Sequence, residues 1–257
     1  MHIFYYLIGA QARDIYLLDN GIEPSRGTMD IDFAVMVPEM DQYNLLISEL
    51  EKHGFERTRE PYRLIYRPSD VVVDLLPFGE IEQMATVRFS ERNIEISVIG
   101  FKEVAENAVD YNIDNLTFKV SPLGGLCILK LLSWSQKNDR TKDLNDFGTI
   151  LMNYFDINED KFFEGCSENK YNLDDFSEEH FKMDAGARLL GEEIAKILNH
   201  SPELEKNIAD ILHKELENEP GKISRYLISN GFVKDFETMK KVFNQIVLSL
   251  PLNITKK

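Results

Sequence analysis

Three aspartates have the residue type and spacing from which a metal site can be built. Asp30 and Asp32 are one residue apart in a run that continues through Phe33-Ala34-Val35, and alternation along a strand turns both carboxylates to one face. Asp74 follows Val71-Val72-Val73, which predicts a buried strand in which an ionised carboxylate needs a partner. Carboxylates that share a patch repel one another unless a cation lies between them. Oxygen ligands of this kind suit Mg²⁺ or Mn²⁺ bound together with substrate phosphates.

Each part of this pattern also has a structural explanation without chemistry. An Asp-x-Asp pair is common at a solvated strand edge or in a turn. Asp74 is also compatible with a place near the exposed end of its strand, where it meets water or an arginine. The residues alone leave both explanations open.

The first turn of the chain adds a candidate phosphate site. The apolar run from Ile3 to Ile8 predicts a strand that ends at Gly9, and a helix starting around Ala10 would direct free backbone N–H groups at a phosphate chain. An ordinary tight connection to a packed helix would also need a glycine there. Further candidates around this site are Gln11, Thr28, Arg13 and Arg26, and surface ion pairing explains the two arginines equally well.

A second charged group lies in the predicted helices further along the chain. Ser121-Pro122 is a good start for a helix that contains Lys130, and Lys142, Asp143 and Asp146 lie near the start of the next helix. Composition alone explains the lysines by solvation and the acids by the dipole of their helix.

Taken together, these residues resemble the nucleotidyltransferase superfamily. Its pattern is a glycine-containing turn, a later Asp-x-Asp on a strand and a third acid on another strand, here Gly9-Ala10, Asp30 with Asp32, and Asp74. Lys130 followed by Lys142-Asp143-x-x-Asp146 is similar to the signature of bacterial abortive-infection (AbiEii-type) nucleotidyltransferase toxins. The resemblance covers roughly residues 3 to 150.

The resemblance implies metal-dependent transfer of a nucleoside monophosphate from a nucleoside triphosphate to an acceptor hydroxyl. Asp30, Asp32 and Asp74 would be the catalytic and metal-binding residues, with Mg²⁺ or Mn²⁺ as the cofactor. The acceptor would be an RNA end such as that of tRNA, a protein or a small molecule, and an antitoxin protein is a candidate partner. The implied nucleotide-binding residues are Gly9, Ala10, Gln11, Arg13, Arg26, Thr28, Lys130, Lys142, Asp143 and Asp146.

Other classes of function remain open at this point. Ala10 stands where the superfamily commonly has glycine or serine, so the chain also fits a degenerate member that binds nucleotide without turnover. A partner-binding component of a toxin pair is a further alternative. Among enzymes, the second choice is an aminoglycoside-type antibiotic nucleotidyltransferase, because an acidic surface suits a cationic acceptor.

Composition limits the class of protein. The 257 residues are 43% hydrophobic, which is enough for one large core or two modest ones. The net charge of −15 disfavours loose binding to nucleic acid, which depends on neutralising many phosphates. Cys127 and Cys166 lie in unrelated contexts and indicate neither a disulfide framework nor a zinc site. No apolar run approaches the roughly 20 residues that span a bilayer. We therefore expect a cytoplasmic protein with reduced cysteines and no membrane segment.

Hydrophobic periodicity predicts an α+β fold with a mixed, twisted sheet and a helical region after it. The expected domains are 1–120, which the resemblance makes nucleotidyltransferase-like, and 121–257, of which 121–150 would contribute to the active site and 156–175 is the candidate linker. The expected strands after Asp32 are 63–66, 71–76, 85–89, 94–99 and 116–120. The expected helices after residue 38 are a crossover helix before Gly54, then 101–108, 121–136, 141–154, 176–199, 202–217, 221–230 and 235–249.

Overall fold

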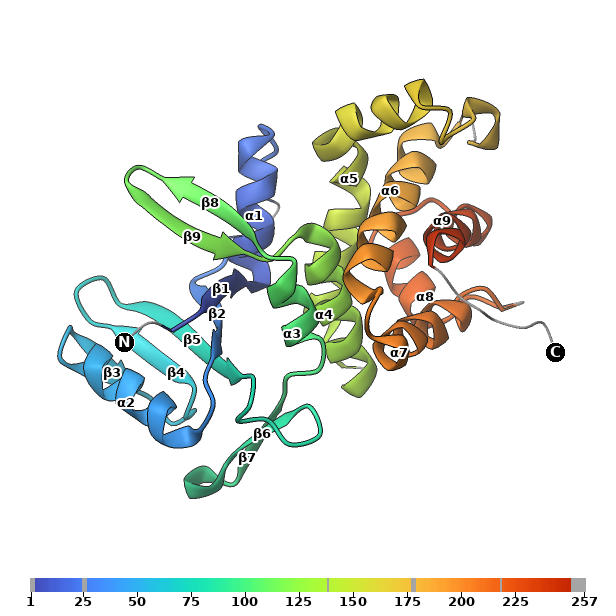
Figure 1. Cartoon of the computed structure of the whole chain (residues 1–257). Coiled ribbons are helices and arrows are strands. Elements are labelled where there is room, and N and C mark those ends of the chain that lie inside the picture. The colour runs from blue at the N-terminus through green and yellow to red at the C-terminus, as the bar shows by residue number, and fades with distance from the viewer. Residues whose placement is uncertain (1–2, 25–26, 138, 177–178, 218, 251–257) are drawn as a thin grey trace. The chain divides into compact units, whose positions relative to one another are not determined.

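The chain divides into two compact units in the computed structural model, which describes residues 3–24, 27–137, 139–176, 179–217 and 219–250 (Figure 1). The sheet unit comprises Met1–Leu18 and Ile22–Pro122, and the helical unit comprises Asp19–Gly21 and Leu123–Lys257. The strands lie in the first part of the chain and the second part is helical, so the fold is α+β with a mixed sheet, as the sequence predicts.

A mixed sheet forms the centre of the sheet unit. Among the described residues it has seven strands in the order β3-β4-β5-β2-β1-β9-β8. β2 is parallel to β5 and β1 is parallel to β9, while the other neighbours are antiparallel. A separate ribbon joins β6 and β7. The strands are β1 (Tyr5–Ile8), β2 (Asp30–Met36), β3 (Phe55–Arg57), β4 (Arg63–Tyr66), β5 (Val71–Phe78), β6 (Thr86–Phe89), β7 (Ile94–Ser97), β8 (Val109–Ile113) and β9 (Leu116–Val120).

The helices of this unit are α1 (Gly9–Asp19), α2 (Met40–Glu51) and α3 (Phe101–Glu106), and buried tyrosines hold two of them to the sheet. Tyr43 of α2 donates a hydrogen bond to the carbonyl oxygen of Leu75 in β5 at 2.9 Å. Tyr6 of β1 donates to the carbonyl oxygen of Phe101 at 2.7 Å, which fixes the start of α3. Burial of both rings therefore satisfies their hydroxyl groups as well.

The register between β2 and β5 decides which side chains share a face of the sheet. Asp32 lies opposite Asp74, and Ala34 lies opposite Leu76. Because alternate residues of a strand face the same side, Asp30 and Asp32 share a face with Ala34, which is completely buried. One face of the central strands thus changes from carboxylates at the start of β2 to core packing further along it.

The helical unit packs around α6. Glycines allow close helix contacts: a Cβ on Gly186 would lie 2.9 Å from the backbone nitrogen of Phe155 in α5, and one on Gly191 would lie 2.6 Å from the carbonyl oxygen of Ile246 in α9. The helices are α4 (Leu123–Gln136), α5 (Thr141–Ser167), α6 (Phe181–Leu198), α7 (Pro202–His213), α8 (Lys222–Ser229) and α9 (Phe236–Ser249).

The expectation of a linker over 156–175 is wrong for its first part, because α5 continues to Ser167. One residue inside this helix, Asn158, has non-helical dihedral angles (φ −127°, ψ 24°) and marks a kink. Phe162 lies beyond the kink and is completely buried, with its ring stacked on that of Tyr171 at 5.1 Å. The acidic and Asn-containing composition of the segment therefore gave no indication of the contact between Phe162 and Tyr171 in the core.

Two short strands, β3 and β8, were not expected from the sequence. β3 has three residues, and β8 is mostly exposed, so neither carries a hydrophobic pattern of its own. Both cysteines are free, and Cys127 is buried. Over the described part of the chain, no helix combines the length and apolar character needed to cross a membrane.

Candidate active site

The three aspartates predicted from the sequence meet on one face of the sheet. One carboxylate oxygen from each of Asp30, Asp32 and Asp74 lies within 4.8 Å of the others. Backbone pairing produces this cluster, because β2 and β5 are neighbours and place Asp32 directly opposite Asp74. The Asp74 side chain is 8% exposed, whereas that of Asp30 is 38% exposed. The cluster is therefore buried on the β5 side and accessible on the β2 side.

This donor set fits a hard divalent cation. Three carboxylates supply only oxygen ligands, which suit Mg²⁺ and Mn²⁺ better than a softer metal. The separation of the oxygens is short enough for them to face a common ion after small side-chain rotations, and the exposed side leaves coordination positions for phosphate oxygens or water.

Arg63 offsets part of the negative charge of this cluster and was not among the residues selected from the sequence. Its Nε and Nη2 donate hydrogen bonds to the two carboxylate oxygens of Asp74, each at 2.7 Å. Its Nη2 also lies 3.9 Å from Oδ2 of Asp30. Hydrogen bonding to Asp74 raises the pKa of Arg63, so the guanidinium is a permanent positive charge here. Asp74 thus meets both an arginine and the other two aspartates, but the whole residue is 5% exposed and lies inside β5 instead of at an exposed strand end.

A signal for Arg63 was present in the sequence. The predicted strands 63–66 and 71–76 flank a turn, and a hairpin that closes at Tyr66 opposite Val71 places Arg63 opposite Asp74. Directly opposed residues of opposite charge on one sheet face attract each other. Counting the hairpin register would have identified the arginine.

Gly9 brings the start of α1 against Asp32. Its φ of +73° lies in the left-handed region that favours glycine, and a Cβ built there would overlap the Asp32 carboxylate. Ile8, the residue before it, pairs with Asp32 across β1 and β2. The first turn of a helix has unpaired backbone N–H groups, so donors for phosphate begin next to the aspartate cluster.

The other candidates near this turn have different surroundings. Thr28 donates its hydroxyl to the Asp30 carboxylate at 2.5 Å, and its carbonyl accepts a hydrogen bond from the Gln11 side chain at 3.3 Å. These two residues therefore connect α1 to the cluster. Ala10 is 7% exposed and presents no polar side-chain group. Arg26 lies outside the described residues.

Arg13 is the candidate that the structure does not support as a ligand-binding residue. Its side chain is 1% exposed, and Nε and Nη2 both donate to Oδ1 of Asp14, at 2.8 and 2.5 Å. The guanidinium is closed to a ligand because it is buried and ion-paired. The sequence offered surface ion pairing as the alternative for this arginine, whereas the pair with Asp14 is buried.

The charged group of the helical unit forms an ion cluster of its own. Nζ of Lys130 in α4 lies 3.1 Å from Asp143 and 2.6 Å from Asp146, whose side chains are 1% and 2% exposed. Arg140 contacts the second oxygen of Asp143 at 2.6 Å. Burial lowers the pKa of Lys130, but the two carboxylates outweigh it and the pKa is raised overall. Lys142 is exposed and does not join the cluster. A role for these residues at a nucleotide stays a prediction.

Comparison with solved structures finds weak similarity to proteins described as nucleotidyltransferases or synthases. A nucleotidyltransferase-like antigen from Paracoccidioides brasiliensis is 15% identical, with a TM-score of 0.43 over 90% of this chain and 84% of that chain. The antibiotic-resistance factor ANT(2'')-Ia is 11% identical, with a TM-score of 0.37 over 82% and 86%. The cyclic dinucleotide synthase CdnE of Elizabethkingia meningoseptica, solved with GTP and Apcpp, is 10% identical, with a TM-score of 0.24 over 97% and 85%. No protein-family model and no curated protein sequence matches the chain.

Replacing Gly9 with alanine should disturb the aspartate cluster specifically. Gly9→Ala and Gly21→Ala both put a side chain at positive φ, +73° and +70°, and each should cost about 1–2 kcal/mol of stability in urea denaturation. Only at Gly9 does the new Cβ meet Asp32, since nothing lies within 4 Å of one at Gly21. We expect Mn²⁺ affinity, followed by electron paramagnetic resonance, to fall at least about tenfold in Gly9→Ala alone. Equal affinities in the two variants would contradict this placement of Gly9.

Replacing Lys130 with methionine should destabilise the helical unit strongly. Asp143 and Asp146 would lose the ammonium group that balances their buried charge, a change that costs about 3–5 kcal/mol. Lys182→Met is the matched control, because this lysine is 68% exposed in its pair with Asp156 and its loss should cost less than about 1 kcal/mol. Urea denaturation at pH 7 measures both values. Similar losses in the two variants would show that the Lys130 cluster is not a buried ion network.

Proposed function

We propose that the sheet unit is the catalytic part of a metal-dependent nucleotidyltransferase. The observation that carries this proposal is the meeting of Asp30, Asp32 and Asp74 within 4.8 Å of one another on neighbouring parallel strands. The glycine turn that opens α1 beside Asp32 supports it, because a nucleoside triphosphate needs both a cation and backbone donors.

The reaction we propose is transfer of a nucleoside monophosphate. The oxygen of an acceptor hydroxyl forms a bond to the α-phosphorus, the bond from that phosphorus to the bridging oxygen breaks, and pyrophosphate leaves with the electron pair. Mg²⁺ or Mn²⁺, held by Asp30 and Asp32, would neutralise charge on the phosphates and the leaving group. The backbone N–H groups of the first turn of α1, from Gly9 to Gln11, would hold the outer phosphates in place.

Asp74 has two roles open to it, and Arg63 restricts both. Asp74 would ligate a second ion, or Asp74 would accept the proton of the acceptor hydroxyl. Both of its oxygens bind Arg63 in this structure, so either role requires Arg63 to give up at least one hydrogen bond. Arg63 therefore acts as a resident counter-charge that keeps the three carboxylates together before an ion is bound.

Removing either of the two half-buried carboxylates, Asp30 or Asp32, should abolish transfer without unfolding the protein. We expect Asp30→Asn and Asp32→Asn to lower the release of pyrophosphate from a nucleoside triphosphate by at least about 100-fold, since each loses an anionic ligand of the ion. Circular dichroism should stay unchanged. Asp70→Asn is the matched control, because this residue lies in an exposed turn with φ 53°, a conformation that asparagine accepts. Undiminished turnover in either cluster variant would refute the proposed site.

Removing the counter-charge should strengthen metal binding. Arg63→Met removes the positive charge that contacts Asp74 and lies near Asp30, so we expect Mn²⁺ to bind about fivefold or more tightly in the absence of nucleotide. Arg67→Met, on the same hairpin, is the control: Arg67 is 50% exposed and pairs with Glu56 and Asp70 outside the cluster. Paramagnetic resonance titration measures free Mn²⁺ in both proteins. Weaker or unchanged binding in Arg63→Met would argue against this role.

The identity of the acceptor and the nucleobase of the triphosphate are the finer part of the proposal. An RNA end, a protein or a small molecule each offers the required hydroxyl, and a toxin with a cognate antitoxin is one setting for the first two. Incubation with each labelled triphosphate and a cell lysate, followed by separation of RNA, protein and small molecules, identifies both. An aminoglycoside as the labelled product would favour the antibiotic-modifying alternative, which the net charge of −15 supports.

A degenerate relative that binds nucleotide without turnover is the second candidate, and the burial of Ala10 favours it. This position presents no hydroxyl group to a phosphate. Calorimetry with each triphosphate and Mg²⁺ separates the cases: heat of binding without pyrophosphate release supports the degenerate relative. No binding at all would support a module whose function is to bind a partner.

A further inference from the structure

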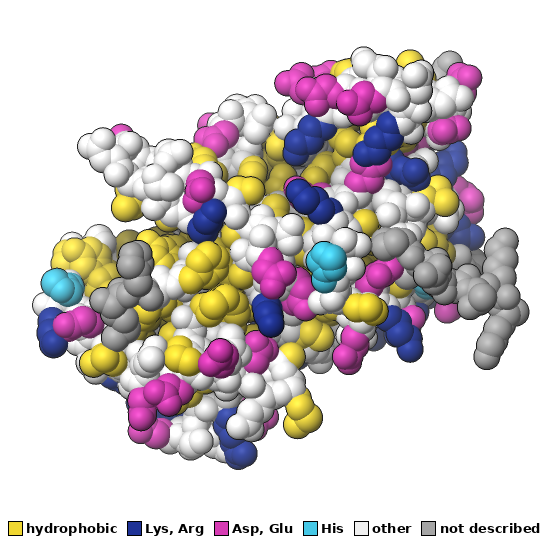
Figure 2. Space-filling model, in the orientation of Figure 1, with side chains coloured by type: hydrophobic (Ala, Val, Ile, Leu, Met, Phe, Trp, Pro, Cys, Tyr) yellow, Lys and Arg dark blue, Asp and Glu magenta, His cyan; other side chains and the backbone are white. Residues whose placement is uncertain are grey.

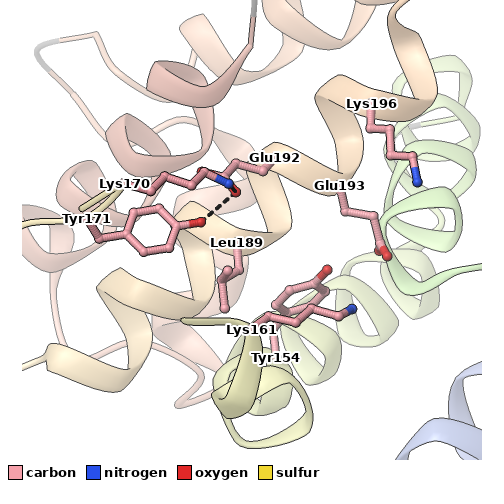
Figure 3. Close-up of a pocket in the computed structure, with 8 residues that line it drawn as sticks. All are labelled: Tyr154, Lys161, Lys170, Tyr171, Leu189, Glu192, Glu193 and Lys196. Atoms are coloured by element: carbon pink, nitrogen blue, oxygen red, sulfur yellow. Dashed lines mark hydrogen bonds and ion pairs between the residues drawn. The ribbon is translucent and has the colours of Figure 1, made fainter. Parts of the chain in front are cut away.

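The helical unit contains a cavity of about 380 Å³ that the proposed reaction does not use (Figure 3). It lies between the C-terminal part of α5 and the face of α6 that carries Leu189, Glu192, Glu193 and Lys196. Binding sites for small molecules start at about 300 Å³, so the volume suits a compact metabolite of nucleoside monophosphate size.

The kink in α5 shapes one wall of this cavity. Asn158 donates a side-chain hydrogen bond to the carbonyl oxygen of Tyr154 at 3.0 Å, and its Oδ1 accepts one from Nζ of Lys161 at 2.7 Å. Asn158, whose dihedral angles are non-helical, thus positions Lys161 beside Tyr154. Figure 3 shows the ends of both side chains near each other at the cavity.

Both carboxylates of the cavity already have partners within the protein. Glu192 accepts hydrogen bonds from Nζ of Lys170 and from the Tyr171 hydroxyl, each at 2.6 Å. Burial, with the hydrogen bond to Glu192, raises the pKa of Tyr171 to about 12, so the hydroxyl stays a donor at neutral pH. Glu193 accepts the backbone N–H of Gly124 in the first turn of α4. Lys170 therefore balances the charge of Glu192, whereas Glu193 is hydrogen-bonded but keeps its negative charge.

Two lysines of the cavity, Lys161 and Lys196, form no ion pair with the described residues. Among the described residues, neither Lys161 nor Lys196 has a carboxylate within ion-pair distance, and Lys161 contacts only the neutral side chain of Asn158. Figure 3 shows the side chains of Lys161 and Lys196 extending toward the space beside Glu193. Figure 2 shows Lys and Arg side chains over α5 and α6, with Asp and Glu side chains beside them. The lining carries three lysines, Lys161, Lys170 and Lys196, against two glutamates, and this positive balance favours an anion in a chain of net charge −15.

We propose that this cavity binds the phosphate group of a small molecule, with Lys161 and Lys196 as its charged donors. Phosphate accepts several charge-assisted hydrogen bonds and needs opposite charge, which these two ammonium groups supply. Leu189 and Tyr154 also line the cavity, but they are only 6% and 2% exposed, so the ligand meets mainly the polar side chains. The site is separate from the aspartate cluster and does not depend on catalysis there.

Binding is tested by calorimetry with inorganic phosphate, pyrophosphate and AMP, using the full chain in EDTA so that no divalent ion can hold phosphate at the aspartate cluster. Nitrogen-15 resonances of the lysine side chains report where the ligand binds. We expect at least one of the three probes to bind and to shift the Nζ signals of Lys161 and Lys196. Tighter binding of AMP than of both inorganic probes would show that the ligand is an organic phosphate, and the reverse order would show an inorganic one.

Three kinds of variant should change the affinity for phosphate in three different ways. Lys161→Met and Lys196→Met each remove a charged donor and should weaken binding about tenfold. Glu193→Gln removes a negative charge but keeps an oxygen for the Gly124 N–H, so it should strengthen binding about fivefold. Lys206→Met is the matched control, because this lysine is exposed on α7 and its loss changes the net charge equally.

The proposal is overturned if none of the three probes binds, or if the two cavity lysines can be replaced without loss of affinity. It is also overturned if Lys206→Met weakens binding as much as they do, which would indicate nonspecific attraction, or if Glu193→Gln weakens binding. None of these outcomes bears on the aspartate cluster, whose test requires a divalent ion.

Discussion

Electrostatic repulsion among Asp30, Asp32 and Asp74 is the constraint around which the sheet unit is built. Pairing of β2 with β5 sets Asp32 directly opposite Asp74, so the backbone ladder holds these charges together without any ligand. Arg63 lies opposite Asp74 on the other neighbouring strand and supplies the compensating charge. Groups mounted on central strands keep their positions better than groups on loops, which suits the joint binding of an ion and a polyanion that we propose here.

Charge compensation also separates structural groups from candidate binding groups in the helical unit. Lys130 lies between two carboxylates that are almost completely buried, so its charge is used inside the protein. Lys161 and Lys196 border a cavity whose own carboxylates are bound to other partners, so their charge is available to a ligand. The same residue type therefore has different roles, and only its neighbours distinguish them.

Much of the sheet unit could be predicted from local patterns. The ends of β4 and β9 agree with the expected 63–66 and 116–120, because turn residues flank each apolar run. The alternation of Asp30 and Asp32 also gave their common face correctly. The limits of α5 could not be predicted in this way: its second part is polar in composition, and its helical state depends on Phe162 packing against aromatic rings distant in sequence. β8 likewise exists because β9 offers it a partner.

The sequence by itself determined the α+β class, the two carboxylates on one strand face and the glycine at the first turn, since these follow from periodicity and from the conformations open to each residue type. Only the tertiary structure decided that β5 lies beside β2 and that Arg13 is buried against Asp14. Strand order and ion pairing depend on which segments meet in space. The register within one hairpin follows from the local sequence, as for Arg63 and Asp74, but the order of strands that are distant in the sequence does not.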